Sequence, residues 1–184
     1  MKKFIFLFSV GLLIISCSFL MKKIETKIVV MKDDSAISAG KIVDYYHSKG
    51  RLVNFSNIYQ TIKAIKRFKP EKLTDFDLID LLAIAMLESD FDSTAVSYAD
   101  AVGVWQVTHI EEFLRTIDGT KNSFDIKCNT DMGLRILLQK LEHFDDKRLA
   151  IIGYNGIVYN DKGVIIDKYY IEWKIRRKIL EEIL

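Results

Sequence analysis

A run of seven apolar residues, 81–87, leads directly into Glu88. Glu88 lies seven residues after Leu81, four after Ile84 and three after Ala85. At 3.6 residues per turn, these four positions share one face of a helix. Because a carboxylate on a buried face costs free energy, the pattern marks Glu88 as a candidate catalytic group. Helical phase alone leaves a second interpretation open, in which Glu88 is an exposed residue at the helix end.

Helical periodicity continues on both sides of this run. It predicts helices at about 36–47 and 56–68, followed by the helix of Glu88 at about 75–89, with Thr74 as its N-cap. Further helices are expected from Thr108 to Ile117, at about 131–144 and at about 166–184. The 131–144 helix would turn four leucines inward: Leu134, Leu137, Leu138 and Leu141. Since the chain contains only one proline, Pro70, the pattern predicts a mainly α protein.

The N-terminus has the pattern of a targeting segment. Two lysines precede an uncharged run at 4–20, which is shorter than the roughly 20 apolar residues of a membrane span and fits a secretory signal. Within it, Ile14-Ile15-Ser16-Cys17 resembles a bacterial lipobox, in which Cys17 would be lipidated after cleavage. An uncleaved anchor or plain secretion is the alternative. We therefore expect a location in the cell envelope, in the periplasm and anchored to the membrane, with a tether at 18–35 that includes a possible short strand at 28–31.

Composition narrows the remaining possibilities. A chain of 184 residues, 49% apolar and 28% charged, is long enough for one globular domain with short extensions. A net charge of +2 does not argue for nucleic acid. A lipidated Cys17 could not pair with Cys128, which is then expected to be a small buried apolar residue. The three histidines are scattered, so we expect neither a metal site nor another cofactor.

Charge patterning bears directly on Glu88. Residues 75–100 contain seven acids and no Lys or Arg. Partial burial, nearby like charges and the negative end of the helix dipole should each disfavour the ionised form of Glu88. Such a carboxyl group keeps its proton near neutral pH, as a general acid requires. Basic residues on the 56–68 and 166–184 helices are expected to form solvated faces, with contact to anionic polymer or lipid as the alternative.

Three short blocks follow one another in the chain. The first places Glu88, Ser89 and Phe91 ahead of five further matching positions: Ala95, Ser97, Ala101, Gly103 and Gln106. The second is Asn129-Thr130-Asp131-Met132-Gly133-Leu134, and the third is Tyr154-Asn155-Gly156. Together they resemble the soluble lytic transglycosylases, bacterial muramidases with a lysozyme-like fold. The resemblance implies a lysozyme-like helical domain with an N-terminal helical extension.

The chain departs from the family pattern at several positions. Asp100 replaces a glycine of the family, and Asp adopts left-handed backbone more readily than most residues. Trp105 stands where the family has Met, so it would narrow the sugar groove or offer a stacking face to a pyranose. The third block lacks the alanine between Asn155 and Gly156. Gly103 and Gly133 are expected to be close-packing positions.

The resemblance also implies roles for individual residues. Glu88 would be the sole catalytic acid/base, while Ser97 and Gln106 would line the site near the reacting sugar and its N-acetyl group. Tyr154 would form a hydrogen bond at or near Glu88, and Asn155 would orient the loop or the substrate. A turn residue is the alternative for Ser97, and a half-buried core aromatic is the alternative for Tyr154.

Three functions are compatible with these residues. The first is a lytic transglycosylase that cleaves the bond between N-acetylmuramic acid (MurNAc) and N-acetylglucosamine (GlcNAc), forming 1,6-anhydro-MurNAc. The second is a lysozyme-like hydrolase in which Asp90, Asp92 or Asp100 holds a water. The third is a peptidoglycan-binding lipoprotein without catalysis. The expected organisation is a signal segment at 1–17, a tether and helical extension at 18–70, and a catalytic domain at 71–184. Peptidoglycan and the membrane are the expected partners of a monomer.

Overall fold

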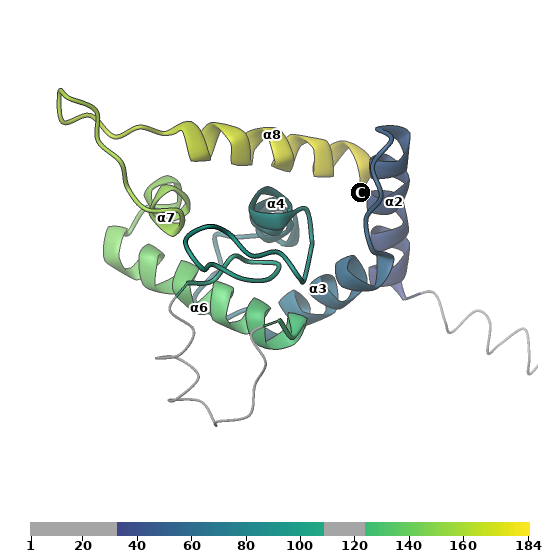
Figure 1. Ribbon diagram of the computed structural model, residues 1–184. Helices are drawn as coiled ribbons and strands as arrows, with labels where there is room; N and C mark the ends of the chain where they lie inside the picture. Colours follow the sequence, from purple (N-terminus) through teal and green to yellow (C-terminus); the bar gives the residue numbers. More distant parts are fainter. Residues whose placement is uncertain (1–32, 109–123) are drawn as a thin grey trace, which may run out of the picture. The chain divides into compact units, whose positions relative to one another are not determined.

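The computed structural model describes residues 33–108 and 124–184, and these are mainly α-helical (Figure 1). The helices are α2 (Asp34–Ser48), α3 (Phe55–Phe68), α4 (Leu78–Ser89), α6 (Ile126–Phe144), α7 (Lys147–Tyr154) and α8 (Lys168–Ile183). The described residues form no β-strand, only isolated bridges at Val96–Val102, Val102–Val107 and Tyr159–Ile165. None of the helices in these two ranges combines the length and apolar character needed to cross a bilayer.

The chain divides into two compact units, 1–37 and 38–184, and the second contains every element described below. The predicted helical class is confirmed; the boundaries of α2, α3, α4, α6 and α8 differ from the predicted ones by a few residues, and α7 was not predicted. Helix α6 begins five residues earlier than predicted because the Asp125 side chain accepts the backbone N–H of Cys128 at 2.9 Å. The lipobox with Cys17, residues 18–32 of the predicted tether and the helix expected after Thr108 lie outside the described residues, whereas residues 34 and 35, predicted to belong to the tether, begin α2.

Helix α4 begins later than predicted, and its N-cap is Asp77, not Thr74. Asp77 and Asp80 form a reciprocal capping box, in which each side chain accepts the backbone N–H of the other, at 2.7 and 2.9 Å. The Thr74 hydroxyl donates instead to the Asp75 carboxylate. The capping box fixes the start of the helix that ends with Glu88.

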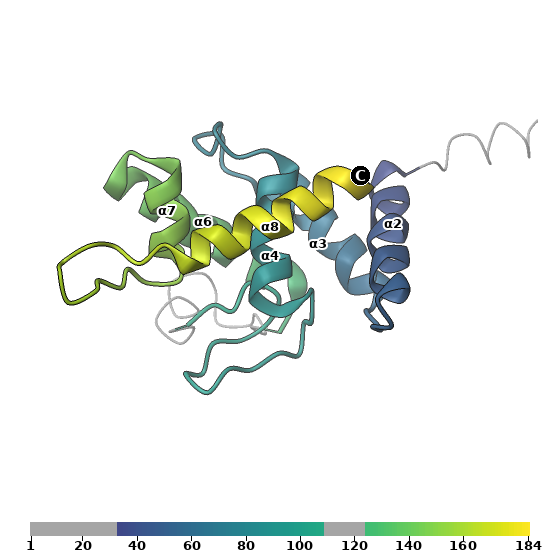
Figure 2. The same ribbon diagram turned by 90° about the horizontal axis from the view of Figure 1, so that it is seen from above.

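Helix α4 is buried almost all round. Figures 1 and 2 show α8 crossing over one side of it, and α3 packs against another. Every side chain from Leu81 to Met86 is at most 2% exposed, and α8 contributes Trp173 and Leu180 to the same core. A helix that is apolar on all faces is stable only when it is enclosed in this way. The core therefore encloses the middle of α4 and leaves its two ends, including the turn that carries Glu88, half-buried.

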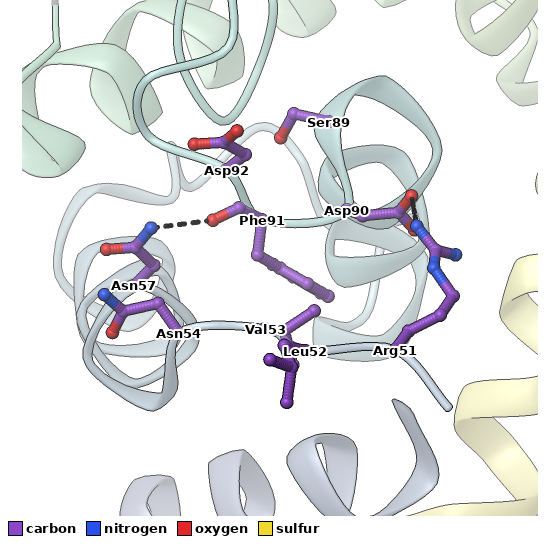
Figure 3. A pocket seen from close by; sticks show the side chains of 9 residues that line it. All are labelled: Arg51, Leu52, Val53, Asn54, Asn57, Ser89, Asp90, Phe91 and Asp92. Atoms are coloured by element: carbon purple, nitrogen blue, oxygen red, sulfur yellow. Dashed lines mark hydrogen bonds and ion pairs between the residues drawn. The ribbon is translucent and has the colours of Figure 1, made fainter. Parts of the chain in front are cut away.

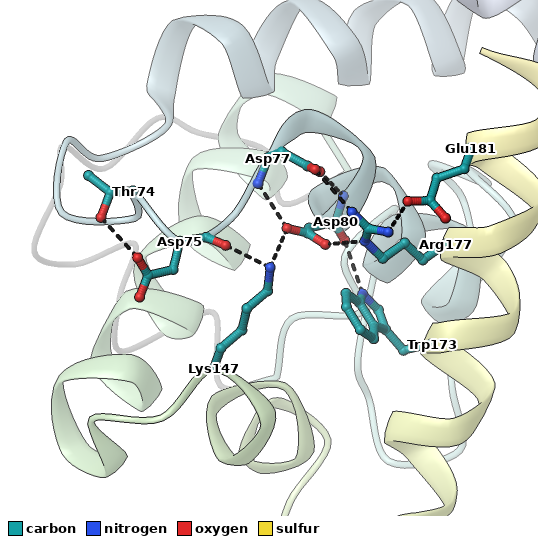
Figure 4. A network of polar contacts seen from close by, with 8 residues as sticks. All are labelled: Thr74, Asp75, Asp77, Asp80, Lys147, Trp173, Arg177 and Glu181. Atoms are coloured by element: carbon teal, nitrogen blue, oxygen red, sulfur yellow. Dashed lines mark hydrogen bonds and ion pairs between the residues drawn. The ribbon is translucent and has the colours of Figure 1, made fainter.

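A buried carboxylate ties the start of α4 to α7 and α8 (Figure 4). Asp80 is 1% exposed, and its two oxygens bind Lys147 Nζ and Arg177 Nε, each at 2.6 Å. The indole N–H of Trp173 donates to the Asp80 carbonyl at 3.1 Å. Because the charge is paired and hydrogen-bonded, its burial is tolerated. Arg177 was predicted to belong to a solvated face, and that prediction is wrong for this residue.

Candidate active site

Helix α4 is followed by two successive residues with left-handed backbone, Asp90 (φ 52°) and Phe91 (φ 64°). This conformation is unusual for a residue as bulky as Phe. It buries the Phe91 ring in the core, where the ring is 1% exposed. The Asp90 carboxylate accepts the Tyr46 hydroxyl at 2.5 Å and pairs with Arg51 at 2.6 Å. The turn that follows Glu88 is therefore held by residues of the N-terminal extension.

Glu88 lies in the last turn of α4 and meets a tyrosine from α8. The Tyr169 hydroxyl donates to Glu88 Oε1 at 2.5 Å. When Glu88 is protonated, Oε1 accepts this hydrogen bond as the carbonyl oxygen, so the acidic proton lies on the other oxygen, Oε2. The contact thus fixes both the orientation of the carboxyl group and the oxygen that carries its proton.

Burial raises the pKa of Glu88 to about 7, and the hydrogen bond from Tyr169 acts in the opposite direction because it stabilises the carboxylate. A carboxyl group with this pKa is about half protonated at neutral pH. The direction predicted from sequence is confirmed, and burial, one of the three predicted causes, accounts for it. The neighbouring Asp80 and Asp90 are each paired with cations, so their charges are locally balanced.

Tyr154, at the end of α7, is the second tyrosine near Glu88. Its hydroxyl donates to the backbone carbonyl of Trp105 at 2.8 Å. Burial and the charge of Glu88 raise the pKa of Tyr154 well above its ordinary value, so the phenol stays protonated. The tyrosine that bonds Glu88 directly is Tyr169, which sequence analysis did not identify.

Trp105 does not face a sugar groove. Its side chain is fully buried, and its ring lies edge-on to the Tyr154 ring with centroids 6.2 Å apart. The ring occupies the space over Gly133, where an added Cβ would lie 2.7 Å from ring atoms. The expectation that Trp105 narrows the groove or stacks on a pyranose is therefore wrong, because no ring face is accessible. The predicted close-packing role of Gly133 is confirmed.

Asn129 holds the loop that follows α4. Its side chain, fully buried, accepts the backbone N–H of Trp105 at 2.8 Å and donates to the carbonyl of Val102 at 2.9 Å. Gly103 (φ 74°) passes so close that an added Cβ would lie 2.7 Å from this amide, which confirms its predicted close-packing role. The Asn129 block and the Glu88 block therefore meet in space.

Ser97 and Gln106 hold the same loop together. Ser97 Oγ accepts the backbone N–H groups of Ala99 and Ala101, at 3.2 and 3.1 Å. Gln106 Nε2 donates to two backbone carbonyls of the loop, at 3.2 and 3.0 Å. Both side chains are half-buried, so their unused atoms can still reach a ligand. Asp100 has φ 58°, which confirms that this position requires left-handed backbone.

The remaining residues that the sequence singled out make local contacts. Asn155 is exposed and caps the C-terminus of α7. Cys128 is half-buried in the first turn of α6, where its Sγ lies 3.7 Å from Met132 Sδ. Asp92, a candidate for holding water, accepts both the backbone N–H and the hydroxyl of Thr94. Across residues 33–108 and 124–184, no three His, Cys, Asp or Glu side chains are grouped so that they could hold a metal ion.

The site thus combines a half-buried acid and two tyrosines. The structure brings Glu88, Tyr154 and Tyr169 together, with Trp105 packed behind them as support. A sequence signal for Tyr169 existed, because it lies four residues before the buried Trp173 on the same face of α8. A tyrosine at the start of a buried stripe places a polar tip at the edge of the core.

A family model described as the transglycosylase SLT domain matches residues 68–169, which include Glu88 and extend as far as Tyr169. Neither the search of curated proteins nor the search of solved structures found a match.

Proposed function

The chain belongs to the transglycosylase SLT domain family, and from that premise we propose that it is a lytic transglycosylase with Glu88 as its single acid/base. The family activity is cleavage of peptidoglycan glycan strands. The proposed reaction breaks the glycosidic bond between MurNAc and GlcNAc and closes a 1,6-anhydro ring on the MurNAc residue.

The observation that carries this proposal is the state of Glu88. Its pKa of about 7 keeps a proton available near neutral pH, and the 2.5 Å bond from Tyr169 leaves that proton on Oε2. In the first step, Oε2 protonates the glycosidic oxygen, the bond to the anomeric carbon breaks, and the N-acetyl group stabilises that carbon.

In the second step, the ionised Glu88 takes the proton of the C6 hydroxyl on the same MurNAc residue. The C6 oxygen bonds to the anomeric carbon, the N-acetyl group is released, and the proton taken from the C6 hydroxyl returns Glu88 to its protonated state, while its original proton stays on the released hydroxyl of the leaving sugar. Because the nucleophile is part of the substrate, no second carboxylate is required to activate a water. Proximity of the internal hydroxyl lowers the barrier to ring closure.

The proposal is tested by digesting purified peptidoglycan with the full-length protein in mild detergent. Soluble muropeptide release should be lost in Glu88→Gln, with the helical circular dichroism spectrum retained. Glu71→Gln, an exposed carboxylate outside the site, is the matched control and should release muropeptides at the wild-type rate. Full activity in Glu88→Gln would refute the assignment. Binding without turnover by the wild-type protein would favour a non-catalytic wall-binding component.

A lysozyme-like hydrolase is the second candidate function. Asp100 is the residue to test, since Asp90 is held by Tyr46 and Arg51 and Asp92 is bonded to Thr94. Asp100→Asn should leave the rate unchanged under our proposal. A large loss of rate in this variant, with hydrated products from the wild type, would establish the hydrolase.

The proposal extends to location. The lipobox ending at Cys17 would place the protein in the cell envelope, on the periplasmic side of a membrane. Metabolic labelling with a radioactive fatty acid should label the wild type and not Cys17→Ala. Equal labelling of both would reject lipidation at Cys17 and leave an uncleaved anchor or plain secretion.

A further inference from the structure

A cavity of about 240 Å³ lies beside the residue that follows Glu88 (Figure 3). Its walls come from two segments that are distant in sequence, 51–57 before and within α3 and 89–92 at the end of α4 and after it. The first wall lies outside the residues matched by the family, 68–169. One half of this cavity is therefore supplied by the N-terminal extension of this chain.

The base of the cavity is apolar and its rim carries both signs of charge. Figure 3 shows the Phe91 side chain directed toward Val53, between Arg51 on one side and the Asn57 amide on the other. Phe91 is fully buried, whereas the Arg51 side chain is 53% exposed. Asp92 is exposed on the same rim. A guanidinium, carboxylates and amides thus surround one small hollow.

Several of these polar groups keep unused hydrogen-bonding capacity. Arg51 pairs with Asp90 through Nη2, which leaves Nε and Nη1 as donors. Asn54 uses its oxygen to cap α3, so its NH₂ group remains available. Asp92 accepts from Thr94 through Oδ1, which leaves Oδ2 as an acceptor. The rim therefore offers donors for a carboxylate and an acceptor for an ammonium group.

A neutral sugar carries no charged group that could pair with the guanidinium or the carboxylate of this rim, whereas a short peptide carries groups of both signs. We propose that this cavity binds the peptide stem attached to the MurNAc residue next to the scissile bond. The stem carries carboxylates and a free ammonium group on its diamino acid, which complement Arg51 and Asp92 respectively. A volume of 240 Å³ lies below the roughly 300–1,000 Å³ of a pocket that encloses a whole drug-sized ligand, so the cavity holds part of the stem. The identity of the substrate rests on the proposed function.

Two charge changes test the site without altering its shape. Asp92→Asn keeps Oδ1 as acceptor for Thr94 and removes the negative charge. Asn54→Asp keeps an oxygen to cap α3, since Asp caps as well as Asn, and adds a negative charge that repels stem carboxylates. Glu71→Gln, an exposed carboxylate outside the cavity, is the matched control.

The first measurement is calorimetric titration of the full-length protein in mild detergent with a free stem tetrapeptide, released from peptidoglycan by an amidase. The second compares kcat/KM on intact glycan strands and on strands stripped of their stems. We expect the wild type to bind the tetrapeptide and to prefer intact strands. Each cavity variant should weaken tetrapeptide binding at least tenfold and lose the preference for intact strands. Glu71→Gln should match the wild type in both.

Absence of tetrapeptide binding together with equal rates on the two kinds of strand would overturn the inference. Binding that neither cavity variant weakens would also overturn it, because the peptide would then bind elsewhere. Failure of the proposed function would give a different set of results. In that case neither kind of strand is cleaved, while tetrapeptide binding and its loss in Asp92→Asn and Asn54→Asp still support the cavity as a peptide site.

Discussion

Replacing Tyr169 with Phe removes the hydroxyl that donates to Glu88 at 2.5 Å and keeps the aromatic ring. The bond stabilises the carboxylate, so its loss should raise the pKa of Glu88 above the wild-type value of about 7. A hydrogen bond to a charged group contributes about 1.5–3 kcal/mol, and 1.36 kcal/mol corresponds to one pKa unit, so the expected rise is about one to two units.

The assay is the pH dependence of kcat/KM for release of soluble muropeptides. Because the first step requires protonated Glu88, kcat/KM of the wild type should fall about tenfold per pH unit above pH 7. In Tyr169→Phe this fall should begin about one to two pH units higher. The rate below pH 6 should decrease as well, because the carboxyl group loses an orienting contact.

The neighbouring tyrosine provides a matched control. Tyr170 stacks on Trp173 with ring centroids 5.4 Å apart. Tyr170→Phe should therefore leave the break in the pH profile at the wild-type position. The reasoning is refuted if Tyr169→Phe leaves the break unchanged or moves it to lower pH, or if both tyrosine variants shift it equally.

Three further predictions concern stability, measured by denaturant unfolding. The pKa of Glu88 is about 7 in the folded protein and 4.5 as its ordinary value, so the free energy of unfolding of the wild type falls as pH rises through this window. Glu88→Gln should therefore be more stable than the wild type by up to about 3 kcal/mol at pH 8 and show no such gain at pH 4. An equal gain at both pH values would contradict this. Gly133→Ala should destabilise the folded protein by about 1–3 kcal/mol because the added methyl group clashes with Trp105. Gly40→Ala is the control, since the added group meets nothing within 4 Å, and it should not destabilise the protein. Equal effects of the two substitutions would count against close packing at Gly133. Asp80→Ala should cost about 3–5 kcal/mol because two cations lose their partner, and a loss below about 1 kcal/mol would mean that the network is screened by water.

Glu88 could be recognised from sequence because the evidence for it is local. Its spacing from Leu81, Ile84 and Ala85 sets its helical face, and burial of that helix then raises the pKa. The family motif begins at the same residue. Both signals lie within a few turns of one helix, where sequence periodicity describes the structure well.

Helical spacing could place Tyr169 on the same face as Trp173, but its contact with Glu88 and the partners of Asp80 could not be recognised in this way. Tyr169 is 81 residues from Glu88, and Arg177 is 97 residues from Asp80. Each belongs to an amphipathic helix whose polar positions read equally well as a solvated face. Only the packing of α8 on α4 decides which of those polar groups turn inward.

Trp105 shows a different limit. Trp105 replaces a smaller residue of the family, so the sequence indicated a larger side chain at this position. It did not indicate whether that side chain points into the groove or into the core. The space for the indole comes from Gly133 on α6, which lacks a side chain where the ring packs. Complementarity between two blocks that are separate in sequence becomes visible only in the folded chain.

The most direct test of Glu88 as a single acid/base is the mass of the soluble muropeptides released from purified peptidoglycan in water enriched in oxygen-18. Our account predicts products lighter by one water than hydrolysis products, without incorporated oxygen-18, and no products from Glu88→Gln. Hydrated products that carry oxygen-18 would contradict it, because water and not the C6 hydroxyl would then be the nucleophile.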